Sequence, residues 1–359
     1  SQYANVFIHE IGHALGLNPP FDDPSPSGKV ATPPYLVGNE NNAVWTQMSY
    51  SGSKKSSEFS PLDIAALQYI YGVSNMAKSG DTFHVYDETR SNFIWDGSGT
   101  DTIAASNSSE PVTIFLEPGL HGFKGLTKMY MPITSPGQIT VNFGTEIENL
   151  IGSSFSDLLT GNNLDNILTG GQGNDVIDGM IGIDTAVYEI DRASAIITLL
   201  NDDDFVKLWN VGSGSSIDSL KNIERLKFND VNVALDLDGN AGKAVKLLSA
   251  LLGPEGALDP YYVGAGLSAL DSGVTYESLM EAGLEFVLGV DPSSTAVINL
   301  FYENLVGSNA PNSILNEYKP LLDEGSLTPA YLGIAVAEHT LNAVNLNLVG
   351  LNETGVDFI

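Results

Sequence analysis

The sequence predicts a multidomain protein of the α+β class, because three stretches of the chain differ in the spacing of their apolar residues. Residues 1–75 and 241–359 repeat apolar side chains at helical intervals, whereas residues 76–240 alternate them over short runs that Gly, Asn, Asp and Ser interrupt. A glycine that recurs at every ninth position over 152–187 predicts a parallel β-roll. We therefore expect a helical N-terminal subdomain, an all-β middle domain that contains the β-roll, and an all-α C-terminal domain.

The composition excludes several classes of function. The chain has 15 Lys and Arg against 44 Asp and Glu, a formal net charge of −29, so its surface repels the phosphates of nucleic acids and anionic membranes. It has no cysteine, which excludes disulfides, thiolate metal sites and thiol nucleophiles. We find no run of about 18 apolar residues and expect no membrane span.

Two helices are predicted in the first stretch. The first covers residues 5–17, where apolar side chains recur at helical intervals. The second covers residues 61–71, because Ser60 is suited to the N-cap and Pro61 to the first helical position. Gly72 is expected to end this helix. In the middle stretch, alternating runs at 82–86, 112–116 and 139–143 predict strands.

The nonapeptide repeat has the form GGxGxDxUx, in which U is apolar. Four units begin at Gly152, Gly161, Gly170 and Gly179, and only the third matches the pattern fully, through Gly170, Gly171 and Gly173. The sixth positions carry Asp157, Asn166, Asp175 and Asp184. Carbonyl and carboxylate oxygens of such turns suit Ca²⁺, and the apolar eighth residues are expected to fill the core. We expect one to three Ca²⁺ ions, held by these sixth side chains and the three glycines.

The last stretch carries a second, weaker repeat. Ala244-Val245 returns as Ala296-Val297, and Leu270-Asp271-x-Gly273 returns as Leu322-Asp323-x-Gly325, with the same offset in the numbering. This shared offset indicates an internal duplication of a helical hairpin. We see no catalytic constellation here and expect the helical tail to act as a scaffold or to dock a partner that the sequence does not identify.

A zinc-binding pattern lies on the first predicted helix. His9 and His13 occupy positions i and i+4, on one helix face, with Glu10 between them as a candidate general base. Gly16 stands where such helices turn sharply, and Met48 supplies the methionine turn that follows them. The pattern predicts hydrolysis assisted by Zn²⁺.

Several motifs together resemble the serralysin family, secreted bacterial zinc metalloproteases of the metzincin clan. They are HEIGHALGL (9–17), MSY (48–50), PLDIAALQYIYG (61–72), GDTFHVYDETRSNFIWDGSGTDTI (80–103), IENLIGSSFSDLLTGN (147–162) and the glycine repeats, which are of the RTX type. The resemblance covers roughly residues 1–190. It implies a metzincin-like catalytic domain, of which residues 1–75 would be the C-terminal half, followed by a calcium-binding β-roll.

The resemblance leaves the third zinc ligand open. The position of the family's third zinc histidine falls on Pro19, whose side chain has no donor atom for a metal. Tyr50 of the methionine turn can reach zinc in this family, and it is expected as a ligand or as a donor to the transition state. Asp22 and Asp23 are the other candidates, if the loop after Pro19 folds back.

The two ends of the chain also bear on the resemblance. The family carries a sheet before the zinc helix, whereas only a short segment precedes His9, so we expect the chain to be a fragment of a longer polypeptide. Asp357-Phe358-Ile359 is similar to the family's terminal signal for the type I secretion apparatus. The resemblance therefore implies an extracellular protein.

Two functions remain open. The first is a secreted, calcium-binding zinc endopeptidase that cleaves proteins or peptides, which Glu10, both histidines and the methionine turn favour. The second is a non-catalytic extracellular calcium-binding protein with a structural, assembly or adhesion role, which Pro19 favours because two histidines alone bind zinc weakly.

Overall fold

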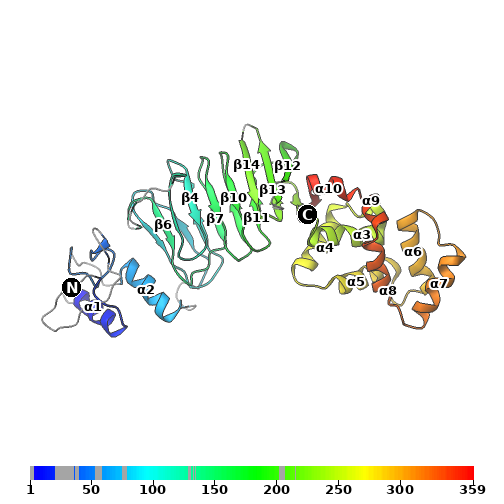
Figure 1. Ribbon diagram of the computed structural model, residues 1–359, viewed down its shortest axis with the longest axis horizontal. Helices are drawn as coiled ribbons and strands as arrows, with labels where there is room; N and C mark the ends of the chain where they lie inside the picture. Colours follow the sequence, from blue (N-terminus) through cyan, green and yellow to red (C-terminus); the bar gives the residue numbers. More distant parts are fainter. Residues whose placement is uncertain are drawn as a thin grey trace. The chain divides into compact units, whose positions relative to one another are not determined.

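A computed structural model describes residues 4–20, 36, 40–52, 59–74, 79–127, 131, 133, 135–201, 207–214 and 216–359. The chain divides into two compact units, Ser1–Gly182 and Ile183–Ile359. Strands fill the middle of the chain and helices its C-terminal part, as the α+β prediction requires (Figure 1). Among the described residues, no helix is long and apolar enough to cross a membrane.

The first unit begins with two helices, α1 (Ala4–Ala14) and α2 (Pro61–Tyr71). The bounds of α2 match those predicted, and the N–H of Gly72 donates to the carbonyl of Gln68 at its end. α1 ends before the predicted Leu17, because Gly16 adopts a φ of 93° that stops the helix.

The strands of the first unit form parts of two sheets. Their bounds are β1 (Phe83–Val85), β2 (Asn92–Ile94), β3 (Thr102–Ala104), β4 (Val112–Phe115), β5 (His121–Lys124), β6 (Gln138–Val141), β7 (Asn149–Ile151), β8 (Leu158–Thr160), β9 (Ile167–Thr169) and β10 (Val176–Asp178). One sheet runs β1-β3-β7-β9 with all pairs parallel. The other runs β10-β8-β4-β5-β6-β2, in which only β5 is antiparallel to its neighbours. Figure 1 shows the short strands stacked one after another.

The central residues of the repeat strands form one buried apolar row of the core between these sheets. The eighth residues of the repeats, Leu159, Leu168, Ile177 and Ala186, are at most 1% exposed. Leu150 and Ile103 continue the same row on β7 and β3 and are fully buried. Each of these short strands thus buries its central residue, which confirms the predicted role of the eighth position.

The second unit contains further strands. They are β11 (Thr185–Val187), β12 (Ala195–Asn201), β13 (Lys207–Ser213), β14 (Ser216–Lys221), β15 (Arg225–Lys227), β16 (Asn232–Ala234) and β17 (Val356–Phe358). β12, β13 and β14 form an antiparallel meander, and β17 pairs antiparallel with β16. The expectation of an all-α end was therefore wrong for 356–358. Apolar spacing over so short a segment cannot distinguish a helix end from a strand whose partner lies far away in the sequence.

The helices of the second unit are α3 (Asn240–Gly256), α4 (Pro260–Asp271), α5 (Tyr276–Leu288), α6 (Ser294–Val306), α7 (Asn312–Asp323), α8 (Pro329–Ala337), α9 (Thr340–Asn345) and α10 (Leu348–Thr354). α4 ends at Asp271 and α7 at Asp323, so the two helices end at equivalent positions of the predicted duplication. α3 and α5 have counterparts in α6 and α8 in the same order, so two successive groups of helices resemble each other.

Arg225 connects the strands and helices of this unit. Its side chain is 6% exposed and forms ion pairs with Asp236, which precedes α3, and with Asp271 at the end of α4. Asp236 also accepts a hydrogen bond from the N–H of Asn240 at 2.9 Å. One buried cation thereby fixes the first two helices against β15.

Candidate functional site

The repeats form turns that their sixth side chains close. Asp157 accepts a hydrogen bond from the N–H of Ser153 at 2.5 Å, and Asn166 accepts one from the N–H of Asn162 at 2.8 Å. Each bond runs from the second to the sixth residue of a repeat. All four predicted sixth side chains are buried, with Asp157 and Asp175 1% exposed and Asn166 and Asp184 fully buried. The repeats therefore hold oxygen-bearing side chains inside the fold.

Alternate repeats stack directly on one another. In the pairing of β10 with β8, Val176 lies opposite Leu158, so the third repeat pairs with the first and not with the second. A Cβ atom on Gly171 would lie 2.2 Å from the carbonyl oxygen of Ser153, and Gly171 and Gly173 have φ values of 103° and 132°. Only glycine can occupy such positions, so the third repeat brings its backbone against the first.

A hydrogen bond also connects the sixth residues of stacked repeats. The N–H of Asp157 donates to Oδ1 of Asp175 at 2.8 Å, and the N–H of Val112 in turn donates to Oδ1 of Asp157 at 2.8 Å. Asp157 thus accepts bonds from its own turn and from the neighbouring strand β4. Asp157 and Asp175, the carboxylates of stacked repeats, therefore lie one above the other and form what we call a carboxylate column.

The structure adds a fifth turn that the repeat analysis missed. Asp96-Gly97-Ser98-Gly99-Thr100-Asp101 follows the same pattern from its second position on, with Asp96 in place of the first glycine and Ile103 at the buried eighth position. Gly99 has a φ of 148°, and a Cβ there would lie 2.8 Å from the carbonyl carbon of Gly80. Oδ1 of Asp101 accepts from the N–H of Thr82 at 2.7 Å, as Asp175 does from Asp157. The template alone could have found this turn, which lies well upstream of the other four.

Glutamates accept similar backbone hydrogen bonds at two other places, next to strands of the other sheet. The N–H of Asp101 donates to Oε2 of Glu148 at 2.7 Å, and within the second unit the N–H of Asp184 donates to Oε2 of Glu224 at 2.9 Å. Burial raises the pKa of both Glu148 and Glu224 above its ordinary value. Neither glutamate was predicted, because each lies outside the nonapeptide repeats.

These turns fit a calcium ion in their donor chemistry. Asp101 is fully buried, and its Oδ2 has no hydrogen-bond partner among the described residues. Burial raises the pKa of Asp101 and of Asp157, so a neutralising cation would relieve the cost of the buried charge. Ca²⁺ prefers carboxylate and carbonyl oxygens, which are the groups that these turns bring together.

The zinc motif lies on α1, with its two histidine rings 4.7 Å apart between centroids. Nδ1 of His9 lies 2.8 Å from the carbonyl oxygen of Gln47, and Nδ1 of His13 lies 3.0 Å from that of Leu17. A carbonyl oxygen only accepts hydrogen bonds, so Nδ1 of each ring carries the proton. This leaves Nε2 as the nitrogen with the lone pair, the arrangement usual for histidine ligands of metals.

The methionine turn packs beneath the zinc helix. Met48 is 2% exposed, and a Cβ on Gly12 would lie 2.5 Å from its sulfur atom. The ring of Tyr50, which is 58% exposed, lies 5.3 Å from that of His9 between centroids. The structure therefore brings His9, His13 and Tyr50 together, with Glu10 exposed on the same helix.

Asp63 on α2 holds the backbone of the methionine turn through hydrogen bonds. It accepts hydrogen bonds from the Thr46 hydroxyl at 2.5 Å and from the N–H groups of Gln47 and Ser60 at 2.6 and 3.0 Å. Burial raises the pKa of Asp63, although these bonds lower it. Because the carbonyl of Gln47 holds His9, Asp63 positions a zinc-motif histidine through the backbone. Sequence reasoning missed this residue.

The described residues contain no group of three His, Asp or Glu side chains that could hold a metal ion. Within the part of the chain that the structure describes, the residues suited to bind zinc at this motif are His9 and His13, and the ring of Tyr50 lies next to that of His9. Asp22 and Asp23, the carboxylates predicted as alternative third ligands, lie outside the described residues.

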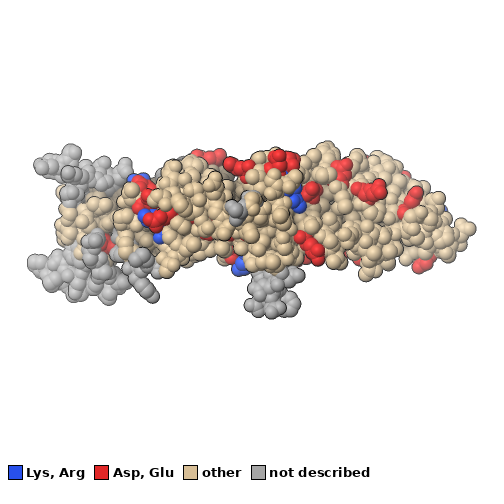
Figure 2. Space-filling model, turned by 90° about the horizontal axis from the view of Figure 1, so that it is seen from above, with Lys and Arg blue, Asp and Glu red and all other residues tan. Residues whose placement is uncertain are grey.

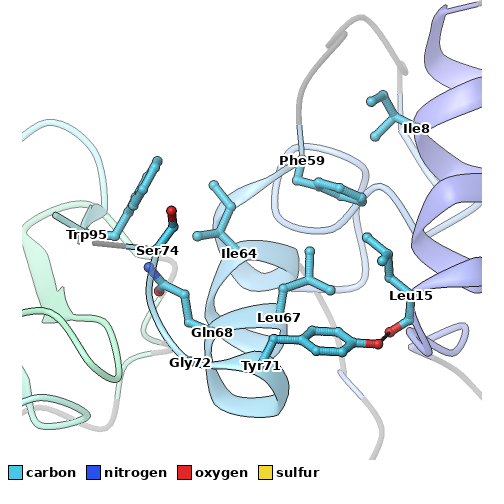
Figure 3. A pocket seen from close by; sticks show the side chains of 10 residues that line it. All are labelled: Ile8, Leu15, Phe59, Ile64, Leu67, Gln68, Tyr71, Gly72, Ser74 and Trp95. Carbon is cyan, nitrogen blue, oxygen red and sulfur yellow. Dashed lines mark hydrogen bonds between the residues drawn. The ribbon is translucent and has the colours of Figure 1, made fainter. Parts of the chain in front are cut away.

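An apolar cavity of about 720 Å³ lies between α1 and α2 (Figure 3). Ile8 and Leu15 line one side, Ile64 and Leu67 the other, and the hydroxyl of Tyr71 donates to the carbonyl of Leu15 at 2.8 Å. Its lining contains no His, Asp or Glu, so the candidate chemistry lies outside this cavity.

Comparisons with known proteins agree with the repeats and the zinc motif. The RTX calcium-binding nonapeptide repeat family matches residues 151–186 in four copies. The chain is similar to serralysin B of Dickeya chrysanthemi, with 35% identity over 43% of this chain and 35% of the relative. It is also similar to a serralysin of Photorhabdus laumondii, at 33% identity, and to the metalloprotease AprA of Pseudomonas entomophila, at 34%. These two alignments cover 43% of this chain and 35% and 36% of the relatives.

The chain spans about a third of the length of the curated relatives that it matches. The matches combine the RTX repeats with a family of metalloproteases, as the motifs of the sequence do. Over 43% of its length the chain is therefore similar to serralysin-family proteins, and it carries RTX calcium-binding nonapeptide repeats folded as a β-roll.

Proposed function

We propose that this chain forms part of a secreted, calcium-dependent zinc metalloendopeptidase. Residues 1–75 would supply the zinc helix and methionine turn of a metzincin-like catalytic domain, 76–240 the calcium-binding β domain and 241–359 a separate helical domain. The observation that carries the proposal is the orientation of His9 and His13, because each donates Nδ1–H to a backbone carbonyl and keeps Nε2 for a metal.

The calcium assignment rests on the stacked turns. We assign carboxylate or amide ligands to the sixth residues and backbone ligands to the third repeat: Asp157, Asn166, Asp175, Asp184, Gly170, Gly171 and Gly173. The buried oxygens of Asp101 and the bond from Asp101 to Glu148 support adding the fifth turn to this set. Calcium would then be needed for the β-roll to fold at neutral pH, because buried carboxylates resist ionisation without it.

In the zinc site, His9 and His13 would bind the metal and Tyr50 would act as a further ligand or as a hydrogen-bond donor to the reacting carbonyl. Bound zinc supplies Lewis acidity toward a peptide carbonyl and toward water. Glu10 would accept the proton of the attacking water and later pass it to the leaving amine. Asp63 and Met48 would hold His9 and the helix in position.

The family relationship supports export by a type I apparatus and an extracellular location. A chain without cysteine needs another means of stabilisation outside the cell, and calcium can provide it. Protein or peptide chains would be the substrates if the zinc site is active.

A second candidate is a non-catalytic calcium-binding extracellular protein. Pro19 favours it, since this residue stands where the spacing of the zinc motif requires a third histidine. In that case the β-roll and the helices would serve structure, assembly or adhesion, and the zinc motif would be a remnant.

One pair of measurements separates the two candidates. Zinc content after dialysis and cleavage of casein are measured in Ca²⁺ on the full-length protein that contains this chain and on two variants of it. The variants are Glu10→Ala and the control Glu353→Ala, which replaces an exposed glutamate far along the sequence. The proposal expects one zinc per chain, cleavage by the parent and by Glu353→Ala, and a loss of about 100-fold or more in Glu10→Ala. Equal cleavage by all three proteins would overturn the assignment of Glu10. Zinc binding without cleavage would support the non-catalytic candidate.

A further inference from the structure

The helices of the second unit enclose an apolar cavity of about 320 Å³ between α3, α4 and α5. Leu247 and Leu251 of α3 line it together with Gly266 of α4 and Gly283 of α5. The two leucines are 2% and 3% exposed, whereas Tyr261 and Phe286, which also line the cavity, are 66% and 69% exposed. The cavity therefore has a buried apolar floor and exposed aromatic residues at its mouth.

Glycine allows α5 to pack closely on α3 at one wall of the cavity. A Cβ on Gly283 would lie 2.2 Å from Cδ1 of Leu251, so a larger residue there would push into the cavity wall. A cavity of roughly 150 Å³ already accepts a benzene ring. The volume present is therefore enough for two apolar side chains, such as neighbours on one face of a helix.

Acidic residues outnumber basic ones on the helices that line the cavity, where the basic residues are Lys243 and Lys246 of α3, and Lys246 pairs with Glu338. The segment 247–318 contains nine Asp and Glu and no Lys or Arg. Asp259 and Glu255 are exposed beside the start of α4, and exposed Glu285 directly precedes Phe286. On the face drawn in Figure 2, the right-hand end of the molecule carries Asp and Glu but no Lys or Arg. A ligand for this surface must combine apolar side chains with positive charge.

The second group of helices repeats the arrangement. A cavity of about 320 Å³ lies between α6, α7 and α8, lined by Ile298, Ile314 and Val336 among others. Because α6, α7 and α8 follow α3, α4 and α5 in the same order, a cavity of similar volume recurs in the second group, although α6 and α3 line the two cavities with residues at different positions of the repeat. Random packing defects would not be expected to recur in this way, since natural cores leave few voids.

We propose that the cavity between α3, α4 and α5 binds a cationic amphipathic helix of a partner protein. Two apolar side chains of that helix would enter the cavity beside the rings of Tyr261, Tyr262 and Phe286, of which Tyr262 contacts the other two. The Lys or Arg residues of that helix would face Glu255, Asp259 and Glu285. This is the helix-in-groove mode of recognition, with the acidic rim setting the sign of the partner's charge. It does not depend on whether the zinc site is active.

The test measures binding of fluorescent peptides of about 18 residues, roughly five helical turns, to the full chain in the presence of Ca²⁺. The probe contains only Leu and Lys with all Leu on one helix face. One control peptide has the same composition in scrambled order, and another has Glu in place of Lys. We expect the amphipathic Lys peptide to bind at least about tenfold more tightly than either control.

Variants locate the binding site. Tyr261→Ala with Phe286→Ala should weaken binding by at least about tenfold, and Glu255→Gln with Glu285→Gln by about threefold with a smaller salt dependence. Tyr331→Ala removes a similarly exposed aromatic, 64% exposed, outside the cavity lining and should leave binding within about twofold. All four substituted positions of the cavity variants are exposed, so circular dichroism should show that the variants fold as the parent does.

Three results would overturn the proposal. One is equal binding of the scrambled peptide, which would mean attraction to the acidic surface alone. Another is unchanged binding to the Tyr261→Ala, Phe286→Ala variant. The third is a concentration-dependent dimer in sedimentation that this variant abolishes, which would make a second copy of the chain the occupant.

Discussion

Replacing Asp101 by Asn should change the stability of the β-roll in opposite directions with and without calcium. Asn keeps the shape of the side chain and can still accept from the N–H of Thr82 through its oxygen. The atom that changes is Oδ2, which has no hydrogen-bond partner among the described residues. The substitution therefore removes a buried negative charge without breaking a described hydrogen bond.

The magnitudes follow from these contacts. Without calcium, the variant avoids burying a charged oxygen that lacks a partner, so its free energy of unfolding should exceed that of the parent by about 1–3 kcal/mol. With calcium at about 1,000 times its dissociation constant, one bound ion stabilises the folded parent by about 4.1 kcal/mol, which exceeds the gain expected without calcium. Loss of this ligand should remove much of that amount, and the variant should become the less stable protein.

Urea unfolding followed by circular dichroism, in a chelator and in excess Ca²⁺, measures both signs. Asp165→Asn is the matched control, because Asp165 is an exposed Asp of the second repeat and its replacement removes the same charge. The control should shift the midpoint little in either buffer. A shift of the same sign for Asp101→Asn in both buffers would refute a calcium role for this turn.

Three further predictions concern other parts of the molecule. Gly12→Ala should lower the free energy of unfolding by about 1–3 kcal/mol, because the new Cβ would clash with the side chain of Met48 and this cost exceeds the better helix propensity of Ala. A higher midpoint of thermal unfolding would contradict this packing. Arg225→Ala should destabilise the second unit by about 3–5 kcal/mol, since it leaves Asp236 and Asp271 without their buried cation; an unchanged urea midpoint would argue against that role. In chelator, acidification from pH 7 toward about 5 should raise the free energy of unfolding, because burial raises the pKa of Asp101 and Asp157 in the folded state. Such carboxyls stabilise the fold fully below their pKa in the unfolded chain, which is near 4, and this contribution is lost as the pH rises through their pKa in the folded state. In excess Ca²⁺ the same acidification should lower stability, as protons displace the metal, and midpoints that move in the same direction in both buffers would contradict the linkage.

The sequence predicted those elements whose ends and burial depend on residues within the element itself. α2 has its predicted bounds because proline and glycine fix its two ends through their own backbone preferences. The core position of the repeats was predictable because the nonapeptide period places one apolar residue inside each strand. β17 could not be predicted, since its partner β16 lies far away in the sequence, before all the helices of the second unit, and the paired segment is short.

The candidate site was predicted in part for the same reason. The spacing of His9 and His13 is a property of one helix and could be read directly. The hydrogen bond from His9 to Gln47, and the support that Asp63 gives to Gln47, join residues 38 and 16 positions apart. No local pattern encodes such contacts. Glu148 and Glu224 were missed likewise, because only the stacking of strands brings them to the turns.

The pairing of alternate repeats restricts how a roll of this kind can change in length. Gly152 and Gly170 stand on one edge of the roll, and Gly161 belongs to the other. Insertion of a single nonapeptide would move every later turn to the opposite edge and separate carboxylates that now share a column. Insertion or deletion of two nonapeptides keeps each column intact. Variants of this roll should therefore tolerate the gain or loss of repeats in pairs, whereas the gain or loss of a single repeat should disrupt the strands and turns that follow.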